Sequence, residues 1–350
     1  MDKYSLGYHD LRTDTVQFLK TEGFYVLILV AVIVIGGWQV YAMLKSDETA
    51  VRHLDTVDKK AFLQQVTQDD ATANRRTPEK RSYRILSQWL KFALLCAGAA
   101  TIAILIVLFF MRGRLLPPAD GPPAPWGLWD ILKVAAFFGL VSEGLRFLCA
   151  DRGALPMLGR GDWYAVIFAR LFLIGCIILV VIEERKGALN QLGLRGPFLR
   201  NILIGVTAFV ALQAPLGMYD AAELHYVKRV DLQETLVALL VTRDACVVVL
   251  IAVAAIVVAP VAEELLFRGF LQPAAERWFG TWPAIFLSAV FFAVAHPQFG
   301  VMIPMFILGL TSAWLFARTR SLVASITLHA ANNAYVVLCF LAIRYPGPHS

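Results

Sequence analysis

The chain has 350 residues, of which 58% are hydrophobic and 17% are charged, and its mean hydropathy is +0.64. This composition excludes an ordinary soluble protein, and the 23 Phe and 8 Trp exclude a disordered one. The formal net charge is +6, and the basic residues gather in the polar stretches between apolar runs, which is how membrane proteins set their orientation. We therefore expect membrane lipid as a partner and no nucleic acid.

Long apolar runs recur along the chain, and a membrane-spanning helix needs about 20 mostly apolar residues. The eight clearest runs are Gly23–Leu44, Phe92–Met111, Tyr164–Ile182, Phe198–Met218, Ala245–Leu271, Pro283–Ala295, Val301–Ala317 and Leu322–Ile343. A ninth stretch, Trp126–Leu148, is interrupted by four charged side chains and suits either a buried span or an interfacial helix. The sequence predicts an all-α polytopic membrane protein with a bundle of eight, or nine, transmembrane helices.

Polar and proline-rich stretches divide the chain into three parts. Residues 1–125 form an N-terminal anchor region with two spans, a charged loop at 45–91 and a Pro-rich linker at 113–126. Residues 126–189 hold interfacial or membrane helices that lead to a core at 190–344. The ten Lys and Arg of the charged loop place it in the cytoplasm. The later loops lie on opposite sides of the membrane in the eight-span and nine-span arrangements. The absolute orientation of the protein therefore stays open.

Charged side chains inside a span are costly and usually face a bundle interior or a water-filled cavity. Glu263, Glu264 and Arg268 follow a long uncharged run. Glu264 and Arg268 stand four residues apart on one helical face, in the order that favours an ion pair. Glu263 points about 100° away from Glu264, which leaves its carboxylate free.

Two of the six histidines lie in or beside apolar runs. His296 ends one run and is followed by Pro297, which predicts a helix end at this point. His329 lies inside the last run, with Asn332 and Asn333 one turn later. A single buried histidine is most often a packing residue, but two of them in spans adjacent to a free glutamate and an amide favour a functional site.

Such a set of side chains supports three kinds of chemistry. The carboxylate can act as a general base on water while imidazole and amide donors stabilise an oxyanion. Two histidines and a carboxylate can instead bind zinc, or the same groups can relay protons in a transporter. Spacing alone does not choose among the three.

Three short motifs carry a family resemblance. E-E-x-x-x-R, F-x-x-x-H and H-x-x-x-N occur in this order at Glu263–Arg268, Phe292–His296 and His329–Asn333. In order, separation and placement at apolar segments they resemble the CPBP family, the CAAX proteases and bacteriocin-processing enzymes, also called ABI or type II CAAX prenyl endopeptidase-like proteins. Leu192–Arg195 is similar as well. The resemblance covers about residues 190–344.

The resemblance implies an intramembrane endopeptidase that cleaves a membrane-associated protein or peptide in a cavity of the helical bundle. It implies that Glu263, helped by His296, activates the attacking water, and that His329 and Asn333 donate to the oxyanion. The family spacing selects Asn333, although the adjacent Asn332 also shares a face with His329.

Supporting roles follow from the same resemblance. Glu264 and Arg268 hold the helix and the orientation of Glu263, in agreement with the face argument above. Phe292 is a packing residue that shapes the cavity. We expect an integral protein of the bacterial inner, or cytoplasmic, membrane.

Several alternatives stay open at this point. A zinc-dependent metalloprotease would use Glu263, His296 and His329 as ligands, but no H-E-x-x-H pattern or third histidine completes such a set, so we favour a glutamic-type protease without a cofactor. A non-catalytic scaffold or immunity protein could retain the fold. A transporter would favour inverted repeats, and no second segment resembles Glu263–Arg268. Substrate identity, whether prenylated, bacteriocin-like or other, and oligomeric state stay undetermined.

Overall fold

The computed structural model describes residues 93–106, 116, 124–149, 159–184, 192–194, 196–226, 233–242, 244–296 and 299–344. Every element in these ranges is helical, as the sequence predicts. The first apolar run, the charged loop at 45–91 and most of the Pro-rich linker lie outside the described residues, so the predicted anchor region stays a prediction.

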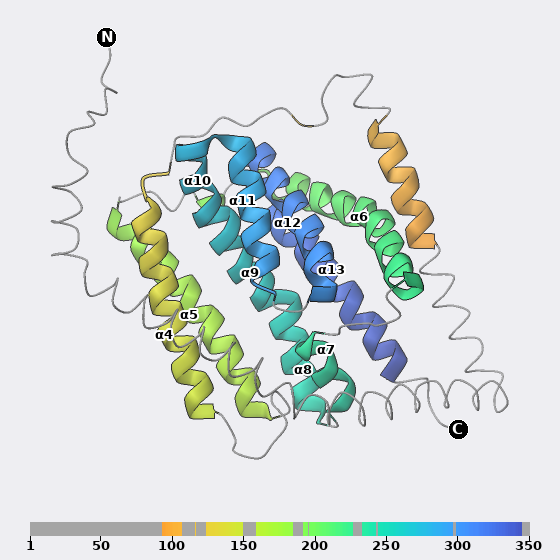
Figure 1. Cartoon of the computed structure of the whole chain (residues 1–350), viewed down its shortest axis with the longest axis horizontal. Helices are drawn as coiled ribbons and strands as arrows, with labels where there is room; N and C mark the ends of the chain where they lie inside the picture. Colours follow the sequence, from red (N-terminus) through yellow and green to blue (C-terminus); the bar gives the residue numbers. More distant parts are fainter. Residues whose placement is uncertain are drawn as a thin grey trace, which may run out of the picture.

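The helices form a bundle around α9–α13, with α4 and α5 side by side on one flank and α6 on the other (Figure 1). A further helix, Ala93–Ile106, packs against α6, because a Cβ on its Gly98 would lie 2.7 Å from the carbonyl oxygen of Val210. The bounds are α4 Leu128–Cys149, α5 Arg160–Glu184, α6 Phe198–Tyr226, α7 Glu234–Val241, α8 Ala245–Val253, η3 Ala254–Val258, α9 Ala259–Glu264, η4 Leu265–Leu271, α10 Gln272–Phe279, α11 Thr281–Val294, α12 Phe299–Thr319 and α13 Leu322–Arg344.

Five of the described helices are long and apolar enough to cross a membrane, so the predicted count of eight or nine spans is not confirmed. They are Arg160–Ile182, Phe198–Ala222, Ala245–Phe279, Val301–Thr319 and Leu322–Leu341. The helix Ala93–Ile106 and α11 are apolar but shorter than a span, since a helix rises only about 1.5 Å per residue. Helix α4 has 22 residues, but its charged side chains lower its hydropathy.

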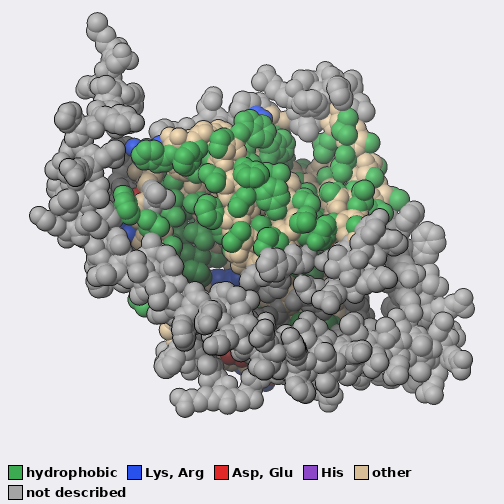
Figure 2. Space-filling view, viewed as in Figure 1, with side chains coloured by type: hydrophobic (Ala, Val, Ile, Leu, Met, Phe, Trp, Pro, Cys, Tyr) green, Lys and Arg blue, Asp and Glu red, His purple; other side chains and the backbone are tan. Residues whose placement is uncertain are grey.

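The surface seen in Figure 2 agrees with a lipid-facing role for these helices. Hydrophobic side chains cover most of the described part of this face, and basic groups appear only in small areas. The large exposed side chains include Leu179, Leu203, Trp278 and Trp282. An exposed apolar surface of this extent is typical of a protein surface that contacts lipid.

One long helix, Ala245–Phe279, carries the first motif and contains two wider π-helical turns, η3 and η4. Pro260 accounts for the first of them, because proline has no N–H and its ring crowds the carbonyl four residues earlier. The turn widens, and the Ala259 N–H bonds to the Ala254 carbonyl, five residues back. In η4, the Phe270 carbonyl accepts a hydrogen bond from Trp126 Nε1 at 2.8 Å.

A tight junction fixes the start of α13, the helix that carries the third motif. Gly193 adopts a φ of 76°, and its carbonyl accepts a hydrogen bond of 2.7 Å from the Leu322 N–H. A Cβ at this glycine would lie 2.7 Å from the ring of Phe316. The segment that begins at Leu192 was noted above for its family resemblance. It contacts both the end of α12, at Phe316, and the start of α13, at Leu322.

At the N-terminal ends of α5 and α8, an exposed ion pair joins α5 to the start of the long central helix. Arg160 donates from Nε and Nη2 to Asp244 at 2.6 and 3.2 Å, and Asp244 also caps α8 by accepting from the Cys246 N–H. The hydrogen bond from Arg160 holds the pKa of Asp244 below its usual range. The pair aligns α5 with the long central helix.

Close packing of α6 on α13 yields a testable prediction. A Cβ at Gly205 would lie 2.5 Å from the Ala324 carbonyl oxygen and 2.7 Å from Thr327, whereas a Cβ at Gly175 would meet nothing within 4 Å. Gly205→Ala should therefore destabilise the protein by about 1–3 kcal/mol, as overpacking does. Thermal unfolding in detergent should show a lower Tm for Gly205→Ala than for the control Gly175→Ala. Equal Tm values would contradict this packing.

Candidate active site

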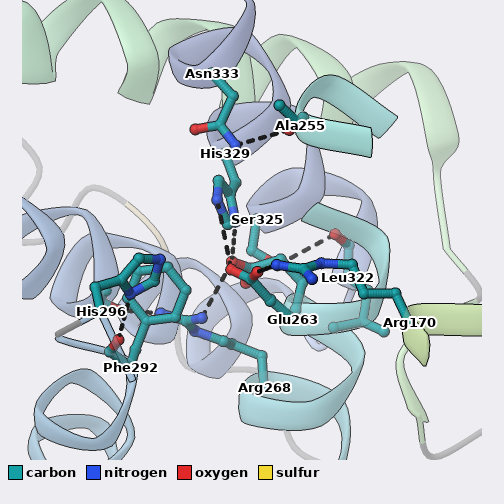
Figure 3. A network of polar contacts seen from close by, with 12 residues as sticks. Arg170, Ala255, Glu263, Arg268, Phe292, His296, Leu322, Ser325, His329 and Asn333 are labelled. Carbon is teal, nitrogen blue, oxygen red and sulfur yellow. Dashed lines mark hydrogen bonds and ion pairs between the residues drawn. The ribbon is translucent and has the colours of Figure 1, made fainter. Parts of the chain in front are cut away.

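The predicted pair of Glu264 and Arg268 is confirmed. Arg268 Nη1 donates to Glu264 Oε1 at 3.1 Å, and both side chains are fully buried. Arg268 Nη2 donates to the Gly309 carbonyl on α12 at 2.9 Å. A buried charge is tolerated when it is paired and hydrogen-bonded, and these contacts meet that condition. Figure 3 shows Arg268 in the same network of polar contacts as Glu263 and His329.

Phe292 forms the apolar centre of the site. Its ring is fully buried, with the Arg268 guanidinium carbon 4.4 Å from the ring centroid. The rings of His296 and His329 lie against the same ring at centroid distances of 5.1 and 5.4 Å. Phe292 therefore sets the spacing among these three groups, which agrees with the packing role expected for it.

The prediction that Glu263 is left unpaired is wrong. Arg170 of α5 donates from Nη2 to Glu263 Oε1 at 3.0 Å. The side chains of Arg170 and Glu263 are 30% and 16% exposed, so this pair lies nearer the surface of the bundle than Glu264 and Arg268. Spacing along one helix could not reveal a partner from another helix 93 positions earlier in the chain.

His329 contacts both glutamates through its two ring nitrogens. Its Nδ1 is 3.0 Å from Glu264 Oε1, and its Nε2 is 3.9 Å from Glu263 Oε2. Glu264 is paired with Arg268 and is therefore an ionised acceptor, so the hydrogen between Glu264 and His329 belongs to Nδ1. The 3.9 Å separation is too long for a direct hydrogen bond.

His296 occupies a separate corner of the site. Helix α11 ends at Val294, as the following proline predicts, and His296 comes two residues later. Its Nδ1 is 2.9 Å from the Phe292 carbonyl, which can only accept a hydrogen. In the neutral ring, Nε2 therefore keeps its lone pair.

Asn333 lies one turn beyond His329 on α13 and contacts the long central helix. Its Nδ2 donates to the Ala255 carbonyl at 2.8 Å, which leaves the second N–H of the amide for another acceptor. The adjacent Asn332 is buried.

The structure thus brings the predicted residues of motifs one and three together, with His296 nearby across Phe292. Arg170 is the functional candidate that the motifs do not contain. A signal for it exists in the sequence, because it is an arginine inside the apolar run Tyr164–Ile182, and such charges mark functional interiors.

A divalent cation fits this set of side chains poorly. Arg170 and Arg268 each place a guanidinium group against one of the two carboxylates, and His329 Nδ1 is committed to Glu264. A cation bound at Glu263 would meet the positive charge of Arg170 at close range. Among the described residues, no group of three or more His, Cys, Asp or Glu side chains is arranged to hold a metal ion.

Comparison with known proteins gives two matches. Residues 245–335 match the family model of "Type II CAAX prenyl endopeptidase Rce1-like" proteins. A protein of Bacillus subtilis (strain 168), named "Putative membrane peptidase YdiL", is 24% identical over 214 residues, which cover 59% of this chain and 84% of the relative. No solved structure matches significantly.

The match to the Rce1-like family model is confined to residues 245–335. The matched segment contains all three motifs and lies inside the predicted core at 190–344. The family resemblance is therefore confirmed, and with the apolar helices the two matches support a membrane protease that is an integral membrane protein. Arg170 lies outside the matched segment.

Removal of the buried guanidinium group of Arg268 should destabilise the protein. Arg268→Ala leaves the Glu264 carboxylate without its charge partner inside the bundle, which costs about 3–5 kcal/mol in comparable buried pairs. We expect a much lower Tm and lower yield of folded protein. The matched control is Arg160→Ala, which removes an exposed pair and should change the Tm little. Equal effects of the two substitutions would contradict the buried ion pair.

Proposed function

We propose that the protein is an intramembrane endopeptidase that hydrolyses a peptide bond of a membrane-associated protein or peptide through a water activated by Glu263 and His296. One observation carries the proposal: Arg170 holds Glu263 Oε1, while Oε2 accepts no hydrogen bond from the described residues and lies 3.9 Å from His329 Nε2. A paired carboxylate with one free oxygen in a low-dielectric interior suits a general base.

Glu263 takes the proton of the attacking water in this mechanism. The ion pair with Arg170 occupies Oε1, which leaves Oε2 to accept that proton. It also fixes the carboxylate so that Oε2, and not Oε1, faces His329. Arg170 therefore acts on the reaction through Glu263, as a positioning residue.

His296 assists from the other side of Phe292. Because its Nδ1–H is held by the Phe292 carbonyl, its Nε2 lone pair is available to accept a hydrogen bond from the water. The backbone contact also fixes the plane of the ring. This is the tautomer that a histidine base needs.

His329 and Asn333 are the proposed donors to the tetrahedral oxyanion. His329 Nδ1 is held by Glu264, so a hydrogen on Nε2 would be directed away from Glu264 and available to the oxyanion. Asn333 has one N–H beyond the one bound to Ala255. Donors fixed before the reaction cost little reorganisation when charge develops.

The atoms of the reaction balance without a further group. Water gives a proton to Glu263 and its oxygen attacks the peptide carbonyl carbon, forming the tetrahedral intermediate. The C–N bond then breaks, and the proton on Glu263 passes to the departing amine nitrogen. We propose no cofactor, because the charge of Arg170 beside Glu263 disfavours a metal ion there.

The substrate class is the part of the proposal that most needs a direct experiment. The name of the matching family model points to prenylated proteins with a CAAX terminus, and a bacteriocin-like precursor is the other class we consider. The proposed location is the bacterial cytoplasmic membrane. Quantitative proteomics of membranes from cells with the wild-type protein or Glu263→Gln should identify a protein whose new terminus depends on Glu263.

Replacement of the base should abolish cleavage without unfolding the protein. Glu263→Gln keeps the size of the side chain and can still accept a hydrogen bond from Arg170, but it cannot take a proton from water. We expect cleavage of the identified substrate to fall to background while the Tm stays near that of the wild type. Glu276→Gln, on the same long helix, is the control and should keep its activity. A Glu263→Gln enzyme within a few-fold of the wild type would refute the assignment.

Chelation separates the glutamic mechanism from a zinc mechanism. Without a metal, activity should survive exhaustive chelation, and elemental analysis of active protein should find no stoichiometric zinc. In a zinc enzyme, loss of a ligand would lower metal occupancy, and added zinc would restore activity after chelation. Stoichiometric zinc that is lost and regained together with activity would overturn the proposal.

A further inference from the structure

The Ala255 carbonyl in the long central helix has lost both of its usual helical donors. In an α-helix its donor would be the N–H of Ala259, but that N–H bonds to Ala254 instead. In a π-helical turn the donor would be the N–H of residue 260, which is Pro260 and has none. A carbonyl without a partner inside a membrane costs several kcal/mol in general, so another donor is needed.

Asn333 supplies that donor from α13. Its Nδ2 lies 2.8 Å from the Ala255 oxygen, and Figure 3 shows the amide reaching from one helix to the other. Because a carbonyl only accepts, the contact also decides which end of the amide faces Ala255, and it must be the nitrogen.

The contact lies beside the polar site on both helices. Asn333 is one turn after His329, and Ala255 precedes the two glutamates on the helix that carries them. The second contact between these helices is that of His329 Nδ1 with Glu264 at 3.0 Å. One polar contact between two helices would still allow them to rotate about that contact. Two contacts fix both the position of one helix along the other and its rotation.

We propose that Pro260, by freeing the Ala255 carbonyl, creates an anchor for Asn333, and that this anchor sets the register in which His329 meets Glu264. Asn333 is thereby a positioning residue in addition to any donation to substrate. The consequence for catalysis rests on the proposed function above, whereas the anchor itself does not.

Nuclear magnetic resonance can detect the anchor without a substrate. The full chain in lipid nanodiscs is labelled with ¹³C at alanine carbonyls and ¹⁵N at isoleucine amides, so that only alanines that precede isoleucine give a signal: Ala103, Ala255, Ala284 and Ala342. Ile256→Val removes the Ala255 signal and assigns it. A second sample with ¹⁵N-histidine, assigned with His329→Gln, reports the His329 ring.

We expect Asn333→Leu to move the Ala255 carbonyl signal upfield, as loss of a hydrogen bond to the oxygen does, and to shift the His329 ring nitrogens. Asn332→Leu, the matched control, should leave Ala255 in its hydrogen-bonded position. Pro260→Ala combined with Asn333→Leu should return the Ala255 signal toward that position, because the helix regains a backbone donor. If Asn333→Leu does not fold, Asn333→Ala gives the same readout with a smaller change of shape.

An unchanged Ala255 signal in folded Asn333→Leu would overturn the anchor. A moved Ala255 signal with unchanged His329 nitrogens would overturn the positioning role. Neither readout uses cleavage, so a failure of the anchor is distinguishable from a failure of the proposed peptidase function.

Discussion

Two adjacent carboxylates inside an apolar bundle are the constraint around which this structure is organised. Each charge would be prohibitively costly without a partner, and each has its own arginine. The fully buried pair of Glu264 and Arg268 is structural, because its charged groups are held by each other, by His329 and by the Gly309 carbonyl. The pair of Glu263 and Arg170 is more exposed and leaves one carboxylate oxygen free. The difference in surroundings gives two neighbouring glutamates two different roles, one as support and one as the proposed base.

The backbone of the long central helix contributes as much to the site as its side chains do. Pro260 and the first π-helical turn leave the Ala255 carbonyl to Asn333, and the Phe270 carbonyl in the second turn accepts a hydrogen bond from Trp126. Small residues permit other close contacts with this helix, such as that of Arg268 with the Gly309 carbonyl. A Cβ at Gly309, for example, would lie 3.1 Å from Phe292 and 3.3 Å from Arg268. A break in the regular helix is therefore part of how the site is assembled.

The sequence predicts local features of this site well and distant ones poorly. The pairing of Glu264 with Arg268 and the end of α11 before His296 follow from helical spacing and from proline, both of which act within a few residues. The partner of Glu263 depends on how α5 packs, and no local rule predicts that. The all-helical class is likewise predictable, but the number of spans is not, because α11 is apolar and yet too short to cross a membrane. Arg170 was detectable as a charge in an apolar run, although its partner was not.

The central claim is that Glu263 Oε2 binds and activates the water that attacks the substrate. An experimental structure of the protein in lipid, at a resolution that reveals ordered water, tests this most directly. The account predicts a water within hydrogen-bonding distance of Glu263 Oε2, with Arg170 on Oε1 and His329 Nδ1 on Glu264. A metal ion bound by Glu263, His296 and His329, or a Glu263 side chain turned away from Arg170 and His329, would contradict it.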